Sequence, residues 1–459
     1  SFAVALIVLV TAAAGAGGFI YYNTNVLNEW VSDRAAGDLA AAYERTYKEL
    51  ESEPQPRITD VSLEVDLYPE IRRVDVRGVL SLRNVSSDRT VERILVNVPV
   101  ELELASLTIP GARLTENDER LRFRIYELDR PLGIGGETSL AYEASIVSRG
   151  FRDKNFDSSI VRNGTFLNNT RLVPTFGYES DMELTDRVER RRRNLPEREP
   201  WPDPDDPEGL MRTITDDADW VNYEAVLSTS SDQTALTTGN LVREWEEGGR
   251  RYFHYRSSHP VLHFYPFVSG RYAVARDEWD GIDIEVYYHP EHEYNIDRMI
   301  ESVRVSLETY SRVWGPYQND HLRIVEFPRY RTFAQSFSGI IPYSEGAYFV
   351  EDLRGERSID RVFFVTAHEV AHQWWGHQIA AAWVRGAMFI EEGMAQYSAL
   401  LVMEQDVGPA KMQRFLRYEL DRYLSGRGAA REDEHPLVSV ENQPYIHYYQ
   451  GSLALYALR

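Results

Sequence analysis

The chain of 459 residues contains no cysteine. It can therefore form neither a disulfide nor a thiolate metal site. Any metal ion that it binds must be held by histidine and carboxylate side chains. The absence of cysteine does not by itself identify a cellular compartment.

Basic residues are in deficit as well. The chain has 50 Lys and Arg against 72 Asp and Glu, which gives a net charge of −22. Nucleic-acid binding requires clustered basic residues, so we expect no nucleic-acid partner. One basic run, residues 190–193, lies in a charged and proline-rich stretch at residues 189–206. We expect a solvated loop there, with binding to anionic lipid headgroups as the alternative.

Charge is missing altogether from residues 2–22, which are long and apolar enough to cross a bilayer. Tyr21 and Tyr22 stand where an interfacial aromatic pair would lie. We therefore predict a transmembrane helix at residues 1–22 that contacts the lipid bilayer through residues 2–22. A signal peptide is one alternative, although a basic start is missing. A buried soluble helix is the other, although its three glycines would weaken it.

Hydrophobic periodicity divides the rest of the chain into three parts. Residues 23–56 show helical spacing and predict a helical stalk. Residues 57–275 alternate with period two between turn residues, which predicts an all-β sandwich or saddle-shaped domain. Residues 276–459 combine strands and amphipathic helices, so we expect an α/β domain. The chain begins with Ser1 and ends inside a helical run, so we expect a segment of a longer membrane protein whose last domain is truncated.

The motif H-E-x-x-H stands at His368, Glu369 and His372 in the stretch FFVTAHEVAHQWWGHQ. Residues four apart lie on one face of a helix, so both imidazoles can bind one ion. Zinc suits such ligands, and a catalytic zinc has three protein ligands and one open position. Glu369 falls beside that open position, where a general base belongs. The alternative is a chance meeting of these residues on a buried helix.

A third ligand is expected from the segment IEEGMAQY, which begins a second apolar helix with Glu391 and Glu392. A carboxylate from this segment can complete the zinc site. Adjacent helical residues point about 100° apart, so only one of the two can face the metal.

These motifs resemble the aminopeptidase N family of gluzincins, in which H-E-x-x-H is followed after eighteen residues by Glu-Gly. Here that spacing reaches Glu391, whereas the Glu-Gly step is made by Glu392 and Gly393. Alignment to Glu-Gly implies that Glu392 is the third ligand of one zinc ion per chain, after a one-residue insertion, but Glu391 stays open. The resemblance also implies a thermolysin-like fold for residues 276–459. It further implies that Tyr448, in the pattern Tyr-x-x-Gly, stabilises the oxyanion.

Recognition of a peptide's free α-amine is less well defined by the sequence. The family uses a Gly-x-Met-Glu-Asn strand, and this motif is missing. The segment SGIIPYSEG supplies Glu345 as the carboxylate that would bind the substrate's ammonium group, with an exposed loop acid as the alternative. Exopeptidase specificity is therefore less firmly implied than zinc chemistry.

The function implied is a membrane-anchored zinc metalloaminopeptidase that removes N-terminal residues from peptides. A zinc endopeptidase and a non-catalytic zinc-containing module that binds peptides remain as alternatives. The apolar span, the segments YNTNVLNEW and PQPRITDVSLEVDLYPE, and the motifs HEVAHQWWGHQ and AQYSAL together resemble bacterial proteins that fuse a peptidase-like domain to an ABC-transporter permease. That resemblance implies an extracytoplasmic peptidase domain associated with ABC-transporter subunits.

Overall fold

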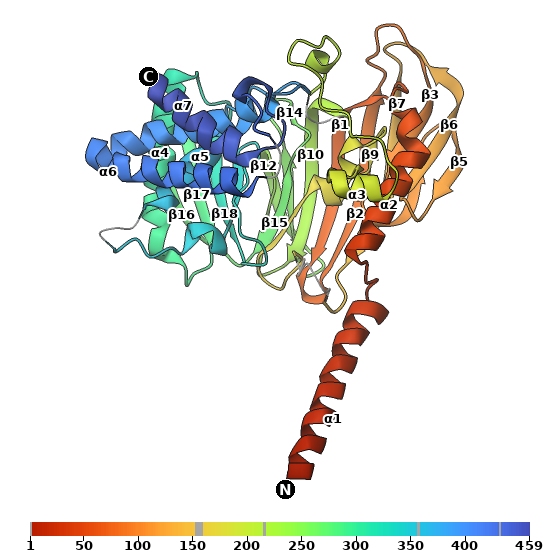
Figure 1. Ribbon diagram of the computed structural model, residues 1–459, viewed down its shortest axis with the longest axis horizontal. Coiled ribbons are helices and arrows are strands. Elements are labelled where there is room, and N and C mark those ends of the chain that lie inside the picture. Colours follow the sequence, from red (N-terminus) through yellow and green to blue (C-terminus); the bar gives the residue numbers. More distant parts are fainter. Residues whose placement is uncertain (1, 152–158, 214–216, 356–358, 431–432) are drawn as a thin grey trace.

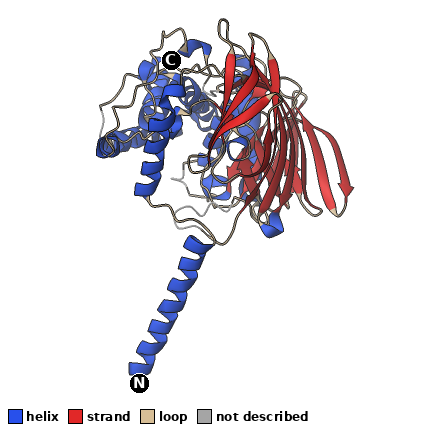
Figure 2. Cartoon of the chain, turned by 90° about the vertical axis from the view of Figure 1, so that its right-hand side faces the viewer, coloured by secondary structure: helices blue, strands red, loops and turns tan. Residues whose placement is uncertain are grey.

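The computed structural model describes residues 2–151, 159–213, 217–355, 359–430 and 433–459. A β-rich domain and a mixed α/β domain lie side by side, and one long helix projects away from the β-rich domain (Figure 1). Figure 2 shows the same division, with most strands gathered on one side and most helices on the other. The expected multidomain order is confirmed: an apolar N-terminal helix, a β-rich domain and a thermolysin-like half.

Helix α1 (Phe2–Tyr21) carries no charge, and none of its residues is buried by the rest of the protein. A π turn, η1 (Tyr22–Val26), continues it. Among the described residues, only the stretch Phe2–Val26 is long and apolar enough to cross a membrane, a judgement that rests on length and composition. A signal sequence near the N-terminus satisfies the same criterion.

Helix α2 (Asp33–Tyr47) forms the second helical stretch and lies on the β-rich domain. It begins where the Ser32 side chain accepts a hydrogen bond from the Ala35 backbone N–H. Tyr43 and Tyr47 are both buried, and the Tyr47 ring lies 4.0 Å from the Phe123 ring, centroid to centroid. These contacts fix α2 on the surface of the β-rich domain.

The described residues of the β-rich domain form three sheets. The large sheet runs β12-β13-β10-β1-β2-β7-β4, with β14 also paired to β10; a second runs β5-β6-β3-β9; and a third runs β11-β15-β8. The strand bounds are β1 (Arg57–Tyr68), β2 (Arg73–Arg83), β3 (Val91–Asn97), β4 (Glu103–Thr108), β5 (Ala112–Asp118), β6 (Phe123–Leu132), β7 (Glu137–Val147), β8 (Thr165–Asn168), β9 (Thr175–Phe176), β10 (Ala218–Ser230), β11 (Thr234–Leu236), β12 (Asn240–Glu247), β13 (Arg250–Arg256), β14 (Val261–Leu262) and β15 (Pro266–Gly270).

Alternation of apolar and polar residues builds this domain. In β1 every second residue from Val61 to Leu67 is buried, and Val65 pairs with Val76 of the antiparallel β2. One face of the large sheet therefore packs into a single core, while the other face remains partly exposed.

The solvated loop expected at residues 189–206 is wrong at its start, because Arg190 to Arg192 lie in helix α3 (Arg187–Arg192), where Asp186 caps the first turn. The buried Arg190 guanidinium donates two hydrogen bonds, of 2.9 and 2.6 Å, to the Glu44 carboxylate of α2. Bidentate pairing satisfies both buried charges, which a sequence count of charges cannot reveal.

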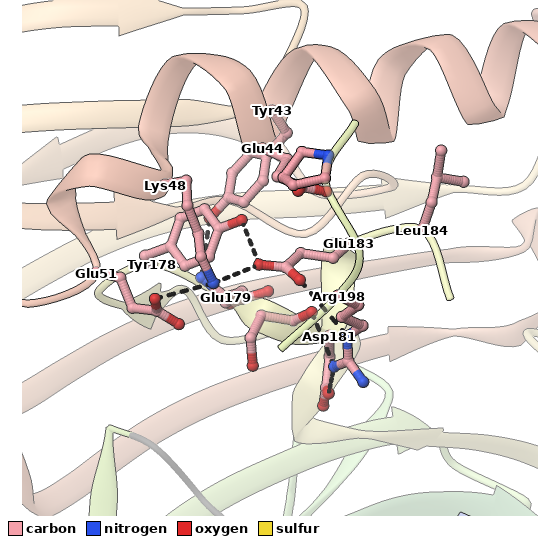
Figure 3. Close-up of polar contacts among 12 residues, drawn as sticks. Tyr43, Glu44, Lys48, Glu51, Tyr178, Glu179, Asp181, Glu183, Leu184 and Arg198 are labelled. Carbon is pink, nitrogen blue, oxygen red and sulfur yellow. Dashed lines mark hydrogen bonds and ion pairs between the residues drawn. The ribbon is translucent and has the colours of Figure 1, made fainter. Parts of the chain in front are cut away.

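A second polar contact joins α2 to the segment after β9 (Figure 3). Glu183 Oε1 accepts hydrogen bonds of 2.8 Å from both Lys48 Nζ and the Tyr178 hydroxyl. Arg198 Nε lies 3.4 Å from the other Glu183 oxygen. Burial raises the pKa of Glu183, but these donors outweigh it and lower the pKa overall. The carboxylate stays charged and fixes α2 to the domain.

The second domain has one sheet, in the order β16-β17-β18-β19, covered by helices (Figure 1). Strand β16 is antiparallel to β17, and the β17–β18 and β18–β19 pairs are parallel. The bounds are β16 (Ala273–Trp279), β17 (Ile282–Tyr288), α4 (Ile296–Val313), β18 (His321–Phe327), β19 (Ile340–Ser344), α5 (Arg361–Ala371), α6 (Met394–Ala429) and α7 (Gly451–Leu458).

Strand β16 crosses the domain boundary expected at residue 275. It pairs along its whole length with β17, so it belongs to the second sheet rather than closing the β-rich domain. Its alternating sequence resembles the strands before it, and only the pairing identifies its sheet.

Candidate zinc and catalytic site

Helix α5 places two histidines one turn apart. It begins where Asp360 accepts a hydrogen bond of 2.9 Å from the Phe363 N–H, and its apolar face is buried. His368 lies in its last turn, and His372 is the residue after its end. Their Nε2 atoms are 3.1 Å apart, so both imidazoles face one point.

Glu392 supplies a third donor atom at this point. It lies in a π turn, η9 (Phe389–Gly393), that leads into α6. Its Oε2 atom is 3.4 Å from His368 Nε2 and 3.2 Å from His372 Nε2. A π turn adds one residue relative to α-helical spacing, which suits a glutamate one position later than the family spacing.

Glu391 points elsewhere. Its Oε1 atom accepts a hydrogen bond of 3.2 Å from the Ala381 backbone N–H, and burial raises its pKa to about 7. The geometry therefore groups Glu392, and not Glu391, with the two histidines.

The three donor atoms fit zinc. Ligands about 2.0–2.1 Å from a tetrahedral zinc ion lie roughly 3.3 Å apart, which matches the separations of 3.1, 3.2 and 3.4 Å. Two imidazoles and a carboxylate are a common catalytic zinc set. Burial raises the pKa of Glu392, but His372 and His368 outweigh it and hold the pKa well below its usual range. The charged carboxylate is thus available to a cation.

The backbone around His372 orients its ring. The Nδ1 atom lies 2.9 Å from the Trp375 carbonyl oxygen, to which it can donate a hydrogen bond. With the proton on Nδ1, the lone pair of Nε2 is free to bind a metal ion.

Glu369 is buried beside the same cluster. Burial raises its pKa, although His368 and His372 lower it. A hydrogen bond with the Ser336 backbone also favours the charged carboxylate. A carboxylate with a raised pKa at this position suits a general base.

Tyr448 approaches the cluster from the C-terminal side, in a π turn at residues 445–450, η11 (Tyr445–Gln450). Its ring centroid lies 5.8 Å from that of His368, and its hydroxyl interacts with Glu392. Burial raises the pKa of Tyr448 well above its usual range, so the hydroxyl stays a neutral donor.

Glu345 is not brought to this cluster. Its Oε1 atom accepts a hydrogen bond of 2.9 Å from the Arg329 backbone N–H, and its Oε2 atom lies 3.9 Å from His292 Nδ1. It belongs to a separate group of potential ligands with His289, His292 and Glu326. The sequence reasoning overlooked those three residues and Ser336; the spacing His-x-x-His at residues 289–292 was the one available signal.

The remaining aromatic and histidine residues of the motif are structural. The Trp374 side chain is buried and donates from Nε1 to the Gly315 carbonyl at 2.9 Å. Nε2 of His377 lies 3.1 Å from the carbonyl oxygen of Ser336. It is outside both potential ligand groups found among the described residues.

Comparisons with known proteins agree with this geometry. Residues 297–450 match the Peptidase family M1 domain. The puromycin-sensitive aminopeptidase of Caenorhabditis elegans is 23% identical over 232 residues, covering 48% of this chain and 24% of that protein. The leucyl aminopeptidase of Saccharolobus solfataricus is 27% identical over 145 residues, covering 31% of this chain and 18% of that protein. The chain thus spans a quarter or less of these relatives' lengths.

A solved M1 zinc metallopeptidase from Deinococcus radiodurans superposes with a TM-score of 0.56 at 16% identity, covering 89% of this chain and 83% of that one. A mutant of it bound to a Tyr-Ser-Ala substrate superposes at 0.55 with 16% identity, covering 88% and 83%. By sequence over residues 297–450 and by fold over most of its length, the chain is therefore similar to the M1 zinc metallopeptidases.

Proposed function

We propose that the protein is a zinc-dependent metallopeptidase of the aminopeptidase type, which hydrolyses peptides at their N-terminus. The observation that carries the proposal is the convergence of His368, His372 and Glu392 at zinc-ligand spacing, with Glu369 and Tyr448 against the same point. A binding module needs the first three residues only, so the last two favour catalysis.

The residues divide the reaction between them. His368, His372 and Glu392 would hold the ion, which supplies Lewis-acid activation of water and carbonyl. Glu369 accepts the proton of the attacking water and delivers it to the leaving amine. The Tyr448 hydroxyl donates a hydrogen bond to the carbonyl oxygen as negative charge develops on it.

Binding of the substrate's ammonium group by Glu345 is the role that the sequence suggests, and it is the alternative to the metal-ligand role inferred below. Its present contacts with Arg329 and His292 support a structural role at least as well. Glu345→Gln separates the two: a role in amine recognition raises KM for free-amine peptides only, whereas a structural role affects all peptides equally.

The test uses one peptide in free-amine and N-acetylated forms, with zinc content measured on the same protein. An aminopeptidase cleaves only the free-amine form and loses activity in Glu369→Gln while keeping zinc. Cleavage of both forms would support an endopeptidase. Zinc binding without cleavage of either form would contradict the proposed catalysis and favour a peptide-binding module.

We further propose that α1 anchors the peptidase to a membrane, with the domain on the extracytoplasmic side and in association with ABC-transporter subunits. The support is the exposed, uncharged helix of 20 residues and the sequence resemblance. Deletion of residues 2–22 should release the protein from lipid vesicles in a flotation assay. Persistent vesicle binding by the deleted form would contradict the anchor. Crosslinking in cells tests the transporter association.

A further inference from the structure

Four potential metal ligands meet at one edge of the second sheet, apart from the site described above. Strands β17, β18 and β19 are parallel, so their carboxyl ends lie together. His289 follows β17 directly, Glu326 is the penultimate residue of β18, and Glu345 follows β19. His292 completes the group from the turn after His289, and one ligand atom of each residue lies within 4.8 Å of the others.

The central carboxylate of this group, Glu326, is buried without a Lys or Arg partner among the described residues. Glu326 is 0% exposed, and among the described residues its ion-pair partners are two histidines rather than Lys or Arg. Its Oε1 atom lies 2.5 Å from His292 Nδ1 and 3.4 Å from His289 Nδ1. With neutral imidazoles, Glu326 carries a buried negative charge and Glu345 a partly exposed one, and a bound cation would stabilise both.

Backbone N–H groups donate hydrogen bonds to the second oxygen of each carboxylate. Glu326 Oε2 accepts a hydrogen bond of 2.7 Å from the His289 N–H, and Glu345 Oε1 accepts one of 2.9 Å from the Arg329 N–H. These contacts turn Oε1 of Glu326 and Oε2 of Glu345 towards the histidines. The donor set is therefore two nitrogens and two oxygens, which suits zinc and related divalent ions.

We propose that His289, His292, Glu326 and Glu345 form a second divalent-cation site, selective for zinc-like ions, that joins the ends of β17, β18 and β19. The separations of 3.4 Å between His289 and Glu326 and 3.9 Å between His292 and Glu345 lie near those of tetrahedral ligands, whereas the 2.5 Å between His292 Nδ1 and Glu326 Oε1 must widen when an ion binds. Four protein ligands close the coordination sphere, so the role is structural.

The surroundings place this site where the two domains meet. The Tyr272 ring stacks on His289 at 5.6 Å, and its hydroxyl donates to the Glu326 carbonyl at 3.0 Å. Gly164, from the β-rich domain, has φ +93° and no side chain; a Cβ there would lie 2.3 Å from Pro328 and 3.3 Å from His289. A cation bound here would strengthen the sheet edge against which the β-rich domain packs.

The experiment counts zinc per chain by elemental analysis after equilibration with zinc and removal of the excess. We expect two equivalents in the unaltered chain and one in each of two double variants. His368→Ala with His372→Ala removes the catalytic site, and His292→Ala with Glu345→Gln removes the second site. Glu291→Gln, an exposed neighbour of His292, is the matched control and keeps two. His292 and Glu345 are each 28% exposed at the side chain, and circular dichroism unchanged from that of the unaltered chain checks that the double variant is folded.

Cobalt provides an independent readout in the variant that lacks both catalytic histidines. Tetrahedral cobalt bound to the second site gives visible absorption, which Glu345→Gln should weaken and Glu291→Gln should not. Zinc should also raise Tm in that variant. Two results would overturn the proposal. In the first, the unaltered chain binds one zinc ion and only the catalytic-site variant loses it. In the second, the unaltered chain binds two zinc ions and the variant with His292→Ala and Glu345→Gln still binds both. If only the proposed catalytic site is wrong, the unaltered chain should bind one zinc ion, and only the second-site variant should lose it.

Discussion

Glu391 and Glu392 are neighbours in the chain, yet their carboxylates have different partners. Oε2 of Glu392 lies 3.2 Å from Nε2 of His372, whereas Oε1 of Glu391 accepts a hydrogen bond from the Ala381 backbone. The pair therefore provides a matched comparison of a proposed metal ligand with a buried carboxylate beside it.

We expect Glu392→Gln to weaken zinc binding by more than about 100-fold, because a neutral amide replaces a charged ligand. Glu391→Gln should keep zinc, since the amide oxygen can still accept from the backbone. Chelator competition measures both affinities. Greater loss in Glu391→Gln would show that the family spacing, and not the π turn, identifies the ligand.

Replacing the proposed base, Glu369, should slow peptide hydrolysis and leave zinc binding unchanged. In Glu369→Gln we expect kcat/KM to fall by about 10² to 10⁴-fold, the usual contribution of general acid–base catalysis. Zinc content should remain that of the unaltered chain. Activity retained within tenfold would exclude Glu369 as the base.

Tyr448→Phe removes one hydroxyl from the site and leaves the ring. We expect kcat to fall about 10² to 10³-fold with little change in KM, as for loss of one oxyanion donor. Tyr449→Phe is the control, because that ring lies 4.8 Å from the Arg422 guanidinium rather than against the histidines. Equal effects of the two changes would indicate a general packing defect.

Glu419 should make stability depend on pH. Burial raises its pKa from 4.5 to about 7, although Gln396 donates a hydrogen bond of 2.6 Å to it. Because the folded chain holds this proton more tightly than the unfolded chain, the free energy of unfolding should fall as pH rises from about 4.5 to 7. The change is on the order of 3 kcal/mol.

Glu419→Gln should remove that dependence and be more stable than the unaltered chain at pH 8. Denaturant unfolding across the pH range measures it, with the exposed Asp421→Asn as control. An unchanged slope between pH 5 and 7 in Glu419→Gln would contradict the assignment.

The buried pair of Arg190 and Glu44 should matter more than the exposed pair of Arg192 and Glu189. Removing one buried partner leaves an uncompensated charge, so we expect Glu44→Leu to cost about 3–5 kcal/mol. Arg192→Gln, which breaks only the exposed pair, should cost at most about 1 kcal/mol. Denaturation followed by tryptophan fluorescence compares the two, and equal small losses would show that Arg190 finds another partner.

Local patterns allowed the sequence to predict much of the site. His368 and His372 lie four residues apart, and helical geometry alone brings them together. Which of Glu391 and Glu392 faces the histidines depends instead on a π turn, and no residue pattern in the sequence predicts that turn. The second ligand group joins His289, which follows β17, to Glu326 of β18, 37 positions later, and the pairing of these strands brings the two together.

The fold was predicted to a similar degree. Alternation identified the strands, but not that β16 pairs with the second sheet. Charge density suggested a loop at residues 190–193, because the sequence does not show that Glu44 lies opposite. Long-range pairing is the information that composition and periodicity lack.

The proposed base, Glu369, is oriented by a hydrogen bond with the main chain at Ser336 rather than with its side chain. The hydrogen bond comes from the backbone at Ser336, and any residue other than proline offers the same main-chain group. The side chain at position 336 can therefore change while the orientation of the base stays unchanged.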